Sequence, residues 1–269
     1  MSINIILPGI FGLALGSFFN VLIWRIPKGI SIVTPPSNCT NCGYRIRFRD
    51  NIPVLSYLYL RGKCRKCGMK ISAVYPAVEV ATAVLLAIIW QFSGFDLSVP
   101  WYQNIVPLLR VISILLLIPI SIIDLRHYII PDRFTLPFLA VSLAVSFLPG
   151  DLSPLQSILG ALAGGGSLLF MGILGTYILK KEDSMGGGDI KMMAYLGALW
   201  GAQAALMGIV IAAFIGSLAG AVLMLTKKLD DEHRIPFGPF LAAGLAIAAF
   251  SGDIILSSYL NFADRLLGF

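Results

Sequence analysis

Charged residues are scarce in this sequence. Only 13% of its 269 residues are Asp, Glu, Lys or Arg, whereas 57% are hydrophobic, and the mean hydropathy is +0.85. Soluble domains contain about 25% charged residues. The deficit, together with the long apolar blocks, excludes an ordinary soluble domain and predicts an all-α integral membrane protein.

Basic residues are missing from the start of the chain. The apolar segment at 3–26 has no Lys or Arg before Arg25. A cleavable signal peptide begins with a basic region and ends at a small-residue cleavage site. Neither feature is present, so we expect this segment to be a retained transmembrane helix.

Long apolar segments follow at intervals. A membrane-spanning helix needs about 20 apolar residues. The run at 190–225 is too long, at about 1.5 Å per residue, for one crossing of a hydrocarbon core of about 30 Å, so we divide it near 200–203. With the first helix this predicts about eight transmembrane helices, the others lying near 76–93, 105–123, 134–149, 156–179, 190–203, 205–225 and 238–260.

Three pairs of glycines are spaced four residues apart within these segments. Small residues at this spacing let helices approach closely in lipid. We therefore expect the glycines to serve helix packing. The pairs are Gly12 and Gly16, Gly160 and Gly164, and Gly216 and Gly220.

The segment 25–75 differs from the rest of the chain, because it holds ten Lys and Arg residues, one acidic residue and all four cysteines. We interpret it as a small polar domain inserted after the first helix, which divides the chain into 1–24, 25–75 and 76–269.

With eight spans and the N-terminus outside, eighteen of the twenty Lys and Arg residues lie on the inner side. Since positive residues concentrate on the cytoplasmic side, the polar domain is expected in the cytoplasm. The net charge of +6 then reflects topology and gives no reason to expect nucleic acid.

Cysteines occur only in two close pairs with the spacing C-x2-C-x21-C-x2-C. This pattern offers four thiolates to one tetrahedral zinc ion, and a reducing cytosol disfavours disulfides. A domain of about fifty residues has little core, so metal binding would contribute to its folding. Four thiolates leave no open coordination position, which favours a structural zinc over a redox-active or nucleic-acid-binding ribbon. The expected ligands are Cys39, Cys42, Cys64 and Cys67.

Basic residues beside the second cysteine pair are expected to offset thiolate charge or to face anionic lipid headgroups. They are Lys63, Arg65 and Lys66.

Two carboxylates lie where apolar segments meet polar ones. Asp124 ends one apolar run, and Asp189 follows three glycines and opens another. An ionisable group at membrane depth is costly and is therefore a functional hypothesis. Two carboxylates in one site share a proton, so that one activates water and the other protonates the carbonyl oxygen, as in aspartyl proteases. We predict that Asp124 and Asp189 form such a catalytic pair.

The residues around Asp189 are expected to support it. Gly186 and Gly188 would let the backbone approach a substrate or a partner helix and adopt non-helical angles, and Lys191 belongs to the same loop. A glycine-rich turn before a helix could instead bind phosphate. The acid that follows, and the lack of GK before Ser or Thr, argue against that alternative. Asp132, just after Pro131, is assigned to a helix cap.

The two acids are not expected to be equivalent. Asp124 ends a helix, where the dipole disfavours a carboxylate, whereas Asp189 begins one, where the dipole favours it. The sequence therefore predicts that Asp124 more often holds the shared proton and that Asp189 activates water.

These features occur with motifs that resemble the type IV prepilin peptidases, the leader peptidases of type II secretion and pilus systems. The resemblance runs nearly from end to end. Asp124 and Asp189 fall on the two catalytic acids of that family. The first cysteine pair departs slightly, with Thr40 where the family often has Pro, but this residue is not a ligand. The matching stretches are GSFFNV to RIP (16–27), DNIPVLSY to RGKCR (50–65), YPAVE (75–79), GGGD (186–189) and IPFGPF (235–240).

The resemblance implies a bacterial inner-membrane endopeptidase that removes a short basic leader from prepilins or pseudopilins, after a Gly, at the cytoplasmic face. It also implies N-methylation of the new terminus with S-adenosylmethionine, an activity associated with members that carry the cysteine domain. Glu79, an acid among apolar residues beside that domain, is considered for the methyl-donor site, with helix packing or capping as the alternative. The acidic run at 230–232 either attracts the basic leader or is a solvated loop.

Three other functions are compatible with parts of the pattern. A presenilin-like protease of other substrates would share the two acids but not the cysteine domain. A transporter would use the acids as proton or ion sites, nearer to mid-membrane. A membrane-tethered zinc ribbon without catalysis would not need them.

Overall fold

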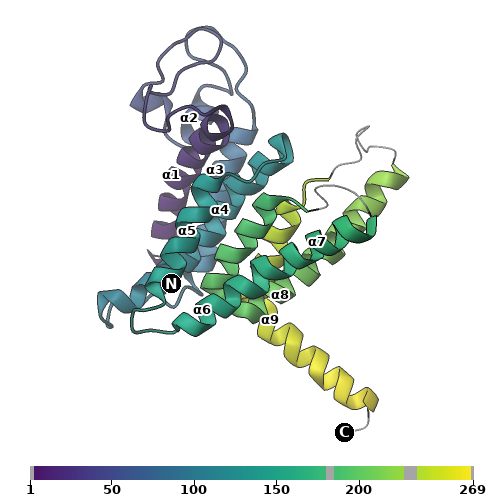
Figure 1. The fold of residues 1–269 in the computed structure, drawn as a ribbon. Coiled ribbons are helices and arrows are strands. Elements are labelled where there is room, and N and C mark those ends of the chain that lie inside the picture. Colours follow the sequence, from purple (N-terminus) through teal and green to yellow (C-terminus); the bar gives the residue numbers. More distant parts are fainter. Residues whose placement is uncertain (1–2, 180–184, 227–234, 268–269) are drawn as a thin grey trace. The chain divides into compact units, whose positions relative to one another are not determined.

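The computed structural model describes residues 3–179, 185–226 and 235–267. These residues are mainly helical, with isolated β-bridges in the cysteine-bearing segment (Figure 1). The prediction of a mostly helical protein is therefore confirmed. The long helices are α1 (Ile3–Arg25), α3 (Val74–Trp90), α4 (Ile105–His127), α5 (Asp132–Val145), α6 (Pro154–Ala161), α7 (Ser167–Leu179), α8 (Gly187–Leu225) and α9 (Gly238–Leu267).

The chain divides into two compact units. One comprises Met1–Ser98 with Val111–Ile123, and the other comprises Val99–Arg110 with Asp124–Phe269. The cysteine-bearing segment belongs to the first unit. The predicted catalytic acids, Asp124 and Asp189, both belong to the second.

Helices α1 and α3 pack backbone against backbone in the first unit (Figure 1). A Cβ on Gly12 would lie 2.6 Å from the Cα of Ala83, and one on Gly16 would lie 2.6 Å from the Cα of Glu79. Real Cβ atoms do not approach a backbone so closely, so neither glycine tolerates a side chain. The expected packing role is confirmed for this pair.

The first half of α8 forms the core of the second unit, packed against α5, α6 and α9. Its sequence is apolar on every side, as expected for a helix that is surrounded by others. The side chains without exposed surface include Met192, Met193, Tyr195, Leu196 and Leu199.

Close helix packing recurs at α6 and α8. A Cβ on Gly160 would collide with the carbonyl of Gly197, and one on Gly164 with that of Met193. Gly216 and Gly220 show no such close approach to a backbone. Their nearest neighbours would be side-chain atoms at 3.4 and 3.5 Å, which is ordinary contact.

The predicted break in the 190–225 run is confirmed. Gly201 adopts φ 86° and ψ 169° within α8, a conformation that favours glycine. Next to this break, Arg110 Nε donates to the carbonyl oxygen of Leu199 at 3.2 Å. The Arg110 guanidinium also lies 5.5 Å from the centre of the Trp200 ring. A lone arginine within apolar sequence thus stabilises the end of the first half of α8.

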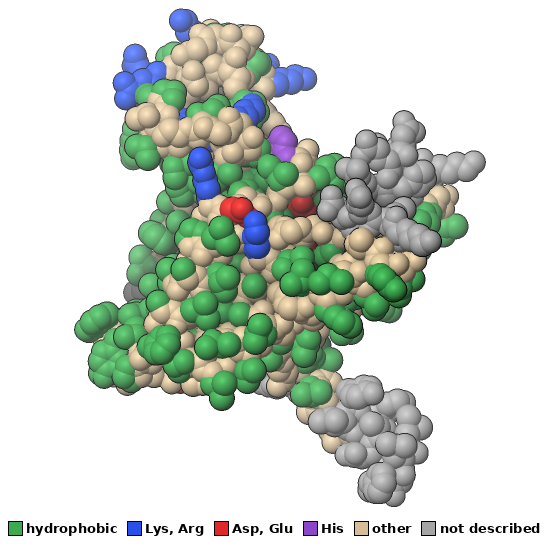
Figure 2. Space-filling model, in the orientation of Figure 1, with side chains coloured by type: hydrophobic (Ala, Val, Ile, Leu, Met, Phe, Trp, Pro, Cys, Tyr) green, Lys and Arg blue, Asp and Glu red, His purple; other side chains and the backbone are tan. Residues whose placement is uncertain are grey.

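Four helices in the described part of the chain are long and apolar enough to cross a membrane: Ile5–Lys28, Trp101–His127, Pro154–Ile178 and Gly187–Leu225. Val74–Trp90 and Gly238–Gly252 are shorter apolar helices. The count of eight spans therefore stays a prediction. Hydrophobic side chains cover much of the helical surface drawn in Figure 2, whereas Lys and Arg gather around the cysteine-bearing segment.

Candidate active site and metal centre

Asp124 lies in the last turn of α4, which ends three residues later at His127. Tyr128 then takes up a left-handed conformation and donates its N–H to the Asp124 carbonyl at 2.8 Å. The Asp124 side chain is buried, and its Oδ2 accepts the backbone N–H of Gly238 at 3.1 Å. Gly238 is the first residue of α9, so this acid connects the end of one helix to the start of another.

Gly238 is a site residue that the sequence analysis did not single out. A Cβ at this position would lie 2.6 Å from Asp124 Oδ2. Glycine is therefore required for the carboxylate to reach the N–H. The sequence feature that could have identified this residue is the Phe-Gly-Pro-Phe stretch, which places a glycine at the expected start of a helix.

Asp189 is the third residue of α8, and its N–H donates to the carbonyl of Gly186 at 3.1 Å. Its side chain is buried, and Oδ1 has no hydrogen-bond partner among the described residues. Buried polar atoms are normally satisfied. An orphaned carboxyl oxygen in a buried position is suited to bind a water or substrate atom.

The glycines before Asp189 leave room for neighbouring side chains, and Gly186 and Gly188 have backbone angles that other residues also adopt. Gly186 has φ −65° and ψ 126°, which any residue adopts, and Gly188 is helical. A Cβ on Gly186 would lie 2.7 Å from Asp189 Oδ2, and one on Gly188 would lie 2.7 Å from Ile130 Cβ. The extended conformation of Gly186 agrees with the expected non-helical angles, and the side chains of Asp189 and Ile130 lie close to the two glycines.

The segments carrying the two acids converge around Ile130. This residue contacts Gly188, before Asp189, and its Cδ1 would lie 3.2 Å from a Cβ on Gly238, the partner of Asp124. The charge of Asp124 also acts electrostatically on Asp189. The fold therefore brings together two buried carboxyl groups that are 65 positions apart in the sequence.

Lys191 lies in the first turn of α8, two residues after Asp189, and its side chain is exposed. Its Nζ forms an ion pair with the Asp132 carboxylate at 2.8 Å, and both side chains are exposed. The assignment of Asp132 as a cap was wrong: the N-cap of α5 is Pro131, and no side-chain hydrogen bond caps the helix. The pair ties the first turn of α8 to that of α5.

The four cysteine sulfurs form a cluster in which all Sγ atoms lie within 4.8 Å of one another. Cys39 and Cys67 Sγ are 3.8 Å apart, and Cys42 and Cys64 Sγ are 4.0 Å apart. A tetrahedral zinc ion about 2.3 Å from each sulfur requires sulfurs about 3.8 Å apart. The cluster is thus positioned to bind a metal ion, and its dimensions fit zinc.

The two cysteine pairs are built alike. The N–H of Gly43 donates to Cys39 O, and that of Gly68 donates to Cys64 O, with both glycines in the left-handed region. The backbone N–H of Met69 lowers the pKa of Cys67 to about 6, whereas burial and the neighbouring cysteines raise the pKa of Cys42 to about 11.

Arg65 forms an ion pair that the sequence analysis did not predict. It binds the carboxylate of Asp50 through both Nε and Nη2, at 2.6 to 3.0 Å, and lowers the pKa of that acid. Its charge is therefore directed to the single acid of the segment, and this pair links the second cysteine pair to η2 (Phe48–Asp50).

Glu79 is buried on α3 and accepts the backbone N–H of Val54 at 2.7 Å, just before the short helix α2 (Leu55–Tyr59). This contact ties α3 to the turn before α2, and it tests neither the capping alternative nor a role toward a methyl donor. The acidic run at 230–232 lies outside the described residues.

Comparisons with known proteins point to one family. Residues 111–225 match the family model described as Type IV leader peptidase family, and residues 10–92 match the Bacterial Peptidase A24 N-terminal domain. A prepilin leader peptidase/N-methyltransferase from Bacillus subtilis is 37% identical over 257 residues, covering 94% of this chain and 97% of the relative. Proteins of the same name from Stutzerimonas stutzeri and Pseudomonas aeruginosa are 33% and 34% identical, over 94% of this chain and 93% and 92% of theirs. No solved structure matches the chain.

Proposed function

Because this chain belongs to the type IV leader peptidase family, we propose that it removes the leader of type IV prepilins and then methylates the new N-terminus. The convergence of two buried carboxyl groups, Asp124 and Asp189, on Ile130 carries the proteolytic part of the proposal. Incubation with a prepilin and S-adenosylmethionine, followed by mass spectrometry, tests both activities through leader loss and an added methyl group.

Proteolysis is assigned to the carboxyl pair. One carboxylate takes a proton from water, which attacks the scissile carbonyl carbon, while the other carboxyl group gives its proton to the carbonyl oxygen. The tetrahedral intermediate then collapses as the C–N bond breaks: the leaving amine takes up the proton held by the first acid, and a hydroxyl group of the intermediate returns a proton to the second acid. This scheme needs no metal, and both carboxyl groups are buried.

The division of labour within the pair is the reverse of the sequence expectation. Asp124 accepts an N–H at the start of α9, and such a bond favours the ionised form. Asp189 Oδ1 has no such donor among the described residues. We therefore assign the shared proton mainly to Asp189 and the activation of water to Asp124. The earlier expectation considered only the helices that carry the two acids and omitted α9.

Single variants separate the two proton positions. In Asp124→Asn, the infrared band of a protonated carboxyl group is expected to persist near neutral pH, because Asp189 keeps its proton. In Asp189→Asn the band is expected to disappear, since Asp124 is ionised by the Gly238 N–H. The double variant provides the baseline. A band that persists only in Asp189→Asn would return the proton to Asp124.

Gly238→Ala is expected to lower kcat for leader cleavage by about 100-fold or more, because its Cβ would displace the Asp124 carboxylate from its position. Gly216→Ala is the matched control, since its Cβ would meet only ring atoms at 3.4 Å. Steady-state cleavage of a fluorescent leader peptide measures both. Equal activity of the two variants would remove the Gly238 contact from the mechanism.

The cysteine cluster is proposed to hold a structural zinc ion. Cys39, Cys42, Cys64 and Cys67 would supply four thiolates, which leaves no coordination position for substrate. The ion would fix the loops between α1 and α3 and is not assigned a step in either reaction.

The apolar helices fit a membrane protein, and the excess of Lys and Arg on the segments assigned to the inner side supports an orientation. We place the protein in the bacterial inner membrane, with the carboxyl pair and the cysteine domain at the cytoplasmic face. Its substrates there are prepilins or pseudopilins with basic leaders that are cut after a Gly. The partners are these substrates and the lipid bilayer, with no role for nucleic acid.

A further inference from the structure

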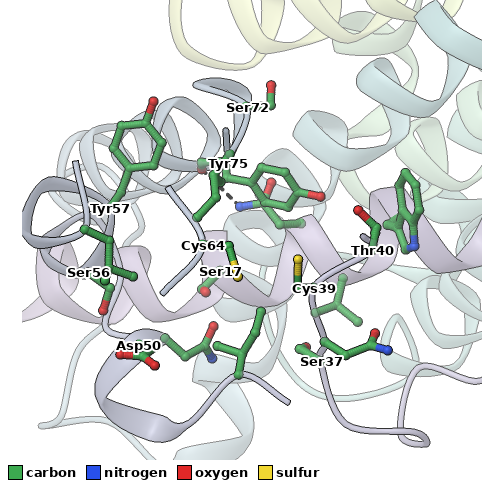
Figure 3. Close-up of a pocket in the computed structure, with 18 of the residues that line it drawn as sticks. Ser17, Ser37, Cys39, Thr40, Asp50, Ser56, Tyr57, Cys64, Ser72 and Tyr75 are labelled. Carbon is green, nitrogen blue, oxygen red and sulfur yellow. Dashed lines mark hydrogen bonds between the residues drawn. The ribbon is translucent and has the colours of Figure 1, made fainter. Parts of the chain in front are cut away.

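The first unit contains a cavity of about 470 Å³. Its walls come from α1, α2, the start of α3 and the loops that carry the cysteines; Figure 3 shows Ser17 of α1, Ser56 and Tyr57 of α2 and Tyr75 of α3 among them. Pockets of about 300 to 1,000 Å³ accommodate small organic ligands. Two of the four cysteines, Cys39 and Cys64, also line this cavity.

One buried acid in the wall has no cationic partner. Glu79 is 7% exposed, and the ion pairs within the described residues join Arg65 to Asp50 and Lys191 to Asp132. Buried charges are expected to be paired, because an unpaired charge is costly to remove from water. A cation that enters the cavity would supply the ionic partner that Glu79 lacks among the described residues.

The chain is strained where it meets Glu79. Val54 has φ 60° and ψ −49°, and the N–H of Leu55 donates to the carbonyl of Pro53 at 2.6 Å, which forms a γ-turn. Positive φ is costly for a β-branched residue and persists only where the surroundings enforce it. This turn directs the N–H of Val54 at Glu79 Oε2 and so holds the carboxylate in position.

The other lining residues suit a flat, polar molecule. Trp24, Tyr57 and Tyr75 offer aromatic surfaces, and the Lys28 ammonium already lies 3.0 Å from the centre of the Trp24 ring. Asn20 is buried, and its Nδ2 donates to the carbonyl of Tyr75 at 3.0 Å. An aromatic base, a cation and polar groups would each find a complementary side chain here.

We propose that this cavity binds S-adenosylmethionine, with its sulfonium cation against Glu79 and its adenine among the aromatic residues. The proposal rests on the methyltransferase part of the proposed function. In the reaction, the neutral terminal amine of the processed pilin attacks the methyl carbon. The N–C bond forms while the C–S bond breaks, both electrons stay on sulfur as a thioether, and the new ammonium releases a proton to solvent. The cysteine loops form part of the wall, so the metal centre would support methyl transfer by shaping this cavity.

Equilibrium binding of radiolabelled S-adenosylmethionine to the purified full-length protein in nanodiscs tests the site. Glu79→Gln is expected to weaken binding about tenfold or more, because a buried charged contact is lost. Asp96→Asn is the matched control: it removes one negative charge from the same unit but lies outside the cavity wall, and wild-type affinity is expected. Unchanged affinity in Glu79→Gln would overturn the proposal.

Photo-crosslinking of the wild type with the labelled donor gives a second test that does not depend on the folding of a variant. Labelled peptides are expected within 17–79, and labels confined to other segments would overturn the site. If the wild type neither binds the donor nor adds a methyl group to a processed pilin, the methyltransferase function fails instead. If the wild type binds the donor but the labelled peptides lie outside 17–79, the assignment of the donor to this cavity fails and the methyltransferase function stands.

Discussion

Asp124→Asn and Asp189→Asn are each expected to reduce leader cleavage by about 1,000-fold or more. General acid and general base steps each contribute about 10² to 10⁴ in rate, and either substitution removes one partner of the proton exchange. The measurement is single-turnover cleavage of a prepilin by each variant in nanodiscs. The double variant is expected to be no slower than the slower single variant, because the two acids act as one unit.

Asp132→Asn is the control for this experiment. It removes an acid of the same unit whose carboxylate is exposed and paired with Lys191, so cleavage is expected to fall by no more than a few fold. All variants must elute as the wild type does on size exclusion. Substantial turnover by either Asp124→Asn or Asp189→Asn would exclude that residue from the reaction.

Cys67→Ser is expected to abolish metal binding and to unfold the segment 25–75. The segment contains only η1 (Ile26–Lys28), η2, α2 and two β-bridges, so little besides the cysteine cluster holds it together. Metal binding and folding are coupled in such small domains. Metal content by mass spectrometry is expected to fall from about one ion per chain to near zero. Hydrogen exchange of the segment is expected to rise at the same time.

Thr40→Ala is the matched control, because Thr40 lies between two expected ligands and offers no sulfur. It should retain metal and protection. Methyl transfer should suffer at least as much as cleavage in Cys67→Ser, since the proposed donor cavity includes the cysteine loops whereas the catalytic acids lie in the other unit. A wild-type protein purified without metal would contradict the zinc site directly.

The sequence by itself determined the class of the protein and the residues to examine. Apolar runs and the scarcity of charge are local properties, so they predict helices without reference to neighbours. The cysteine spacing is also local, because two tight pairs form two similar turns wherever they are placed. Gly201 could be located because a 36-residue apolar run exceeds the thickness of a bilayer, which is a limit set by the solvent.

Only the tertiary structure decided how these parts act on one another. The Gly238 N–H reaches Asp124 across 114 positions of the sequence, and this contact is the reason why the shared proton is proposed to lie mainly on Asp189. The strained turn at Val54 similarly gives Glu79 its position in the wall of a cavity. A residue's helix and its place within that helix follow from nearby residues, whereas its charge state and its ligand depend on groups that folding brings from elsewhere. The sequence therefore indicated the residues that are proposed to carry the chemistry, and the N–H groups of Gly238 and Val54, which folding brings to Asp124 and Glu79, decided the role proposed for each.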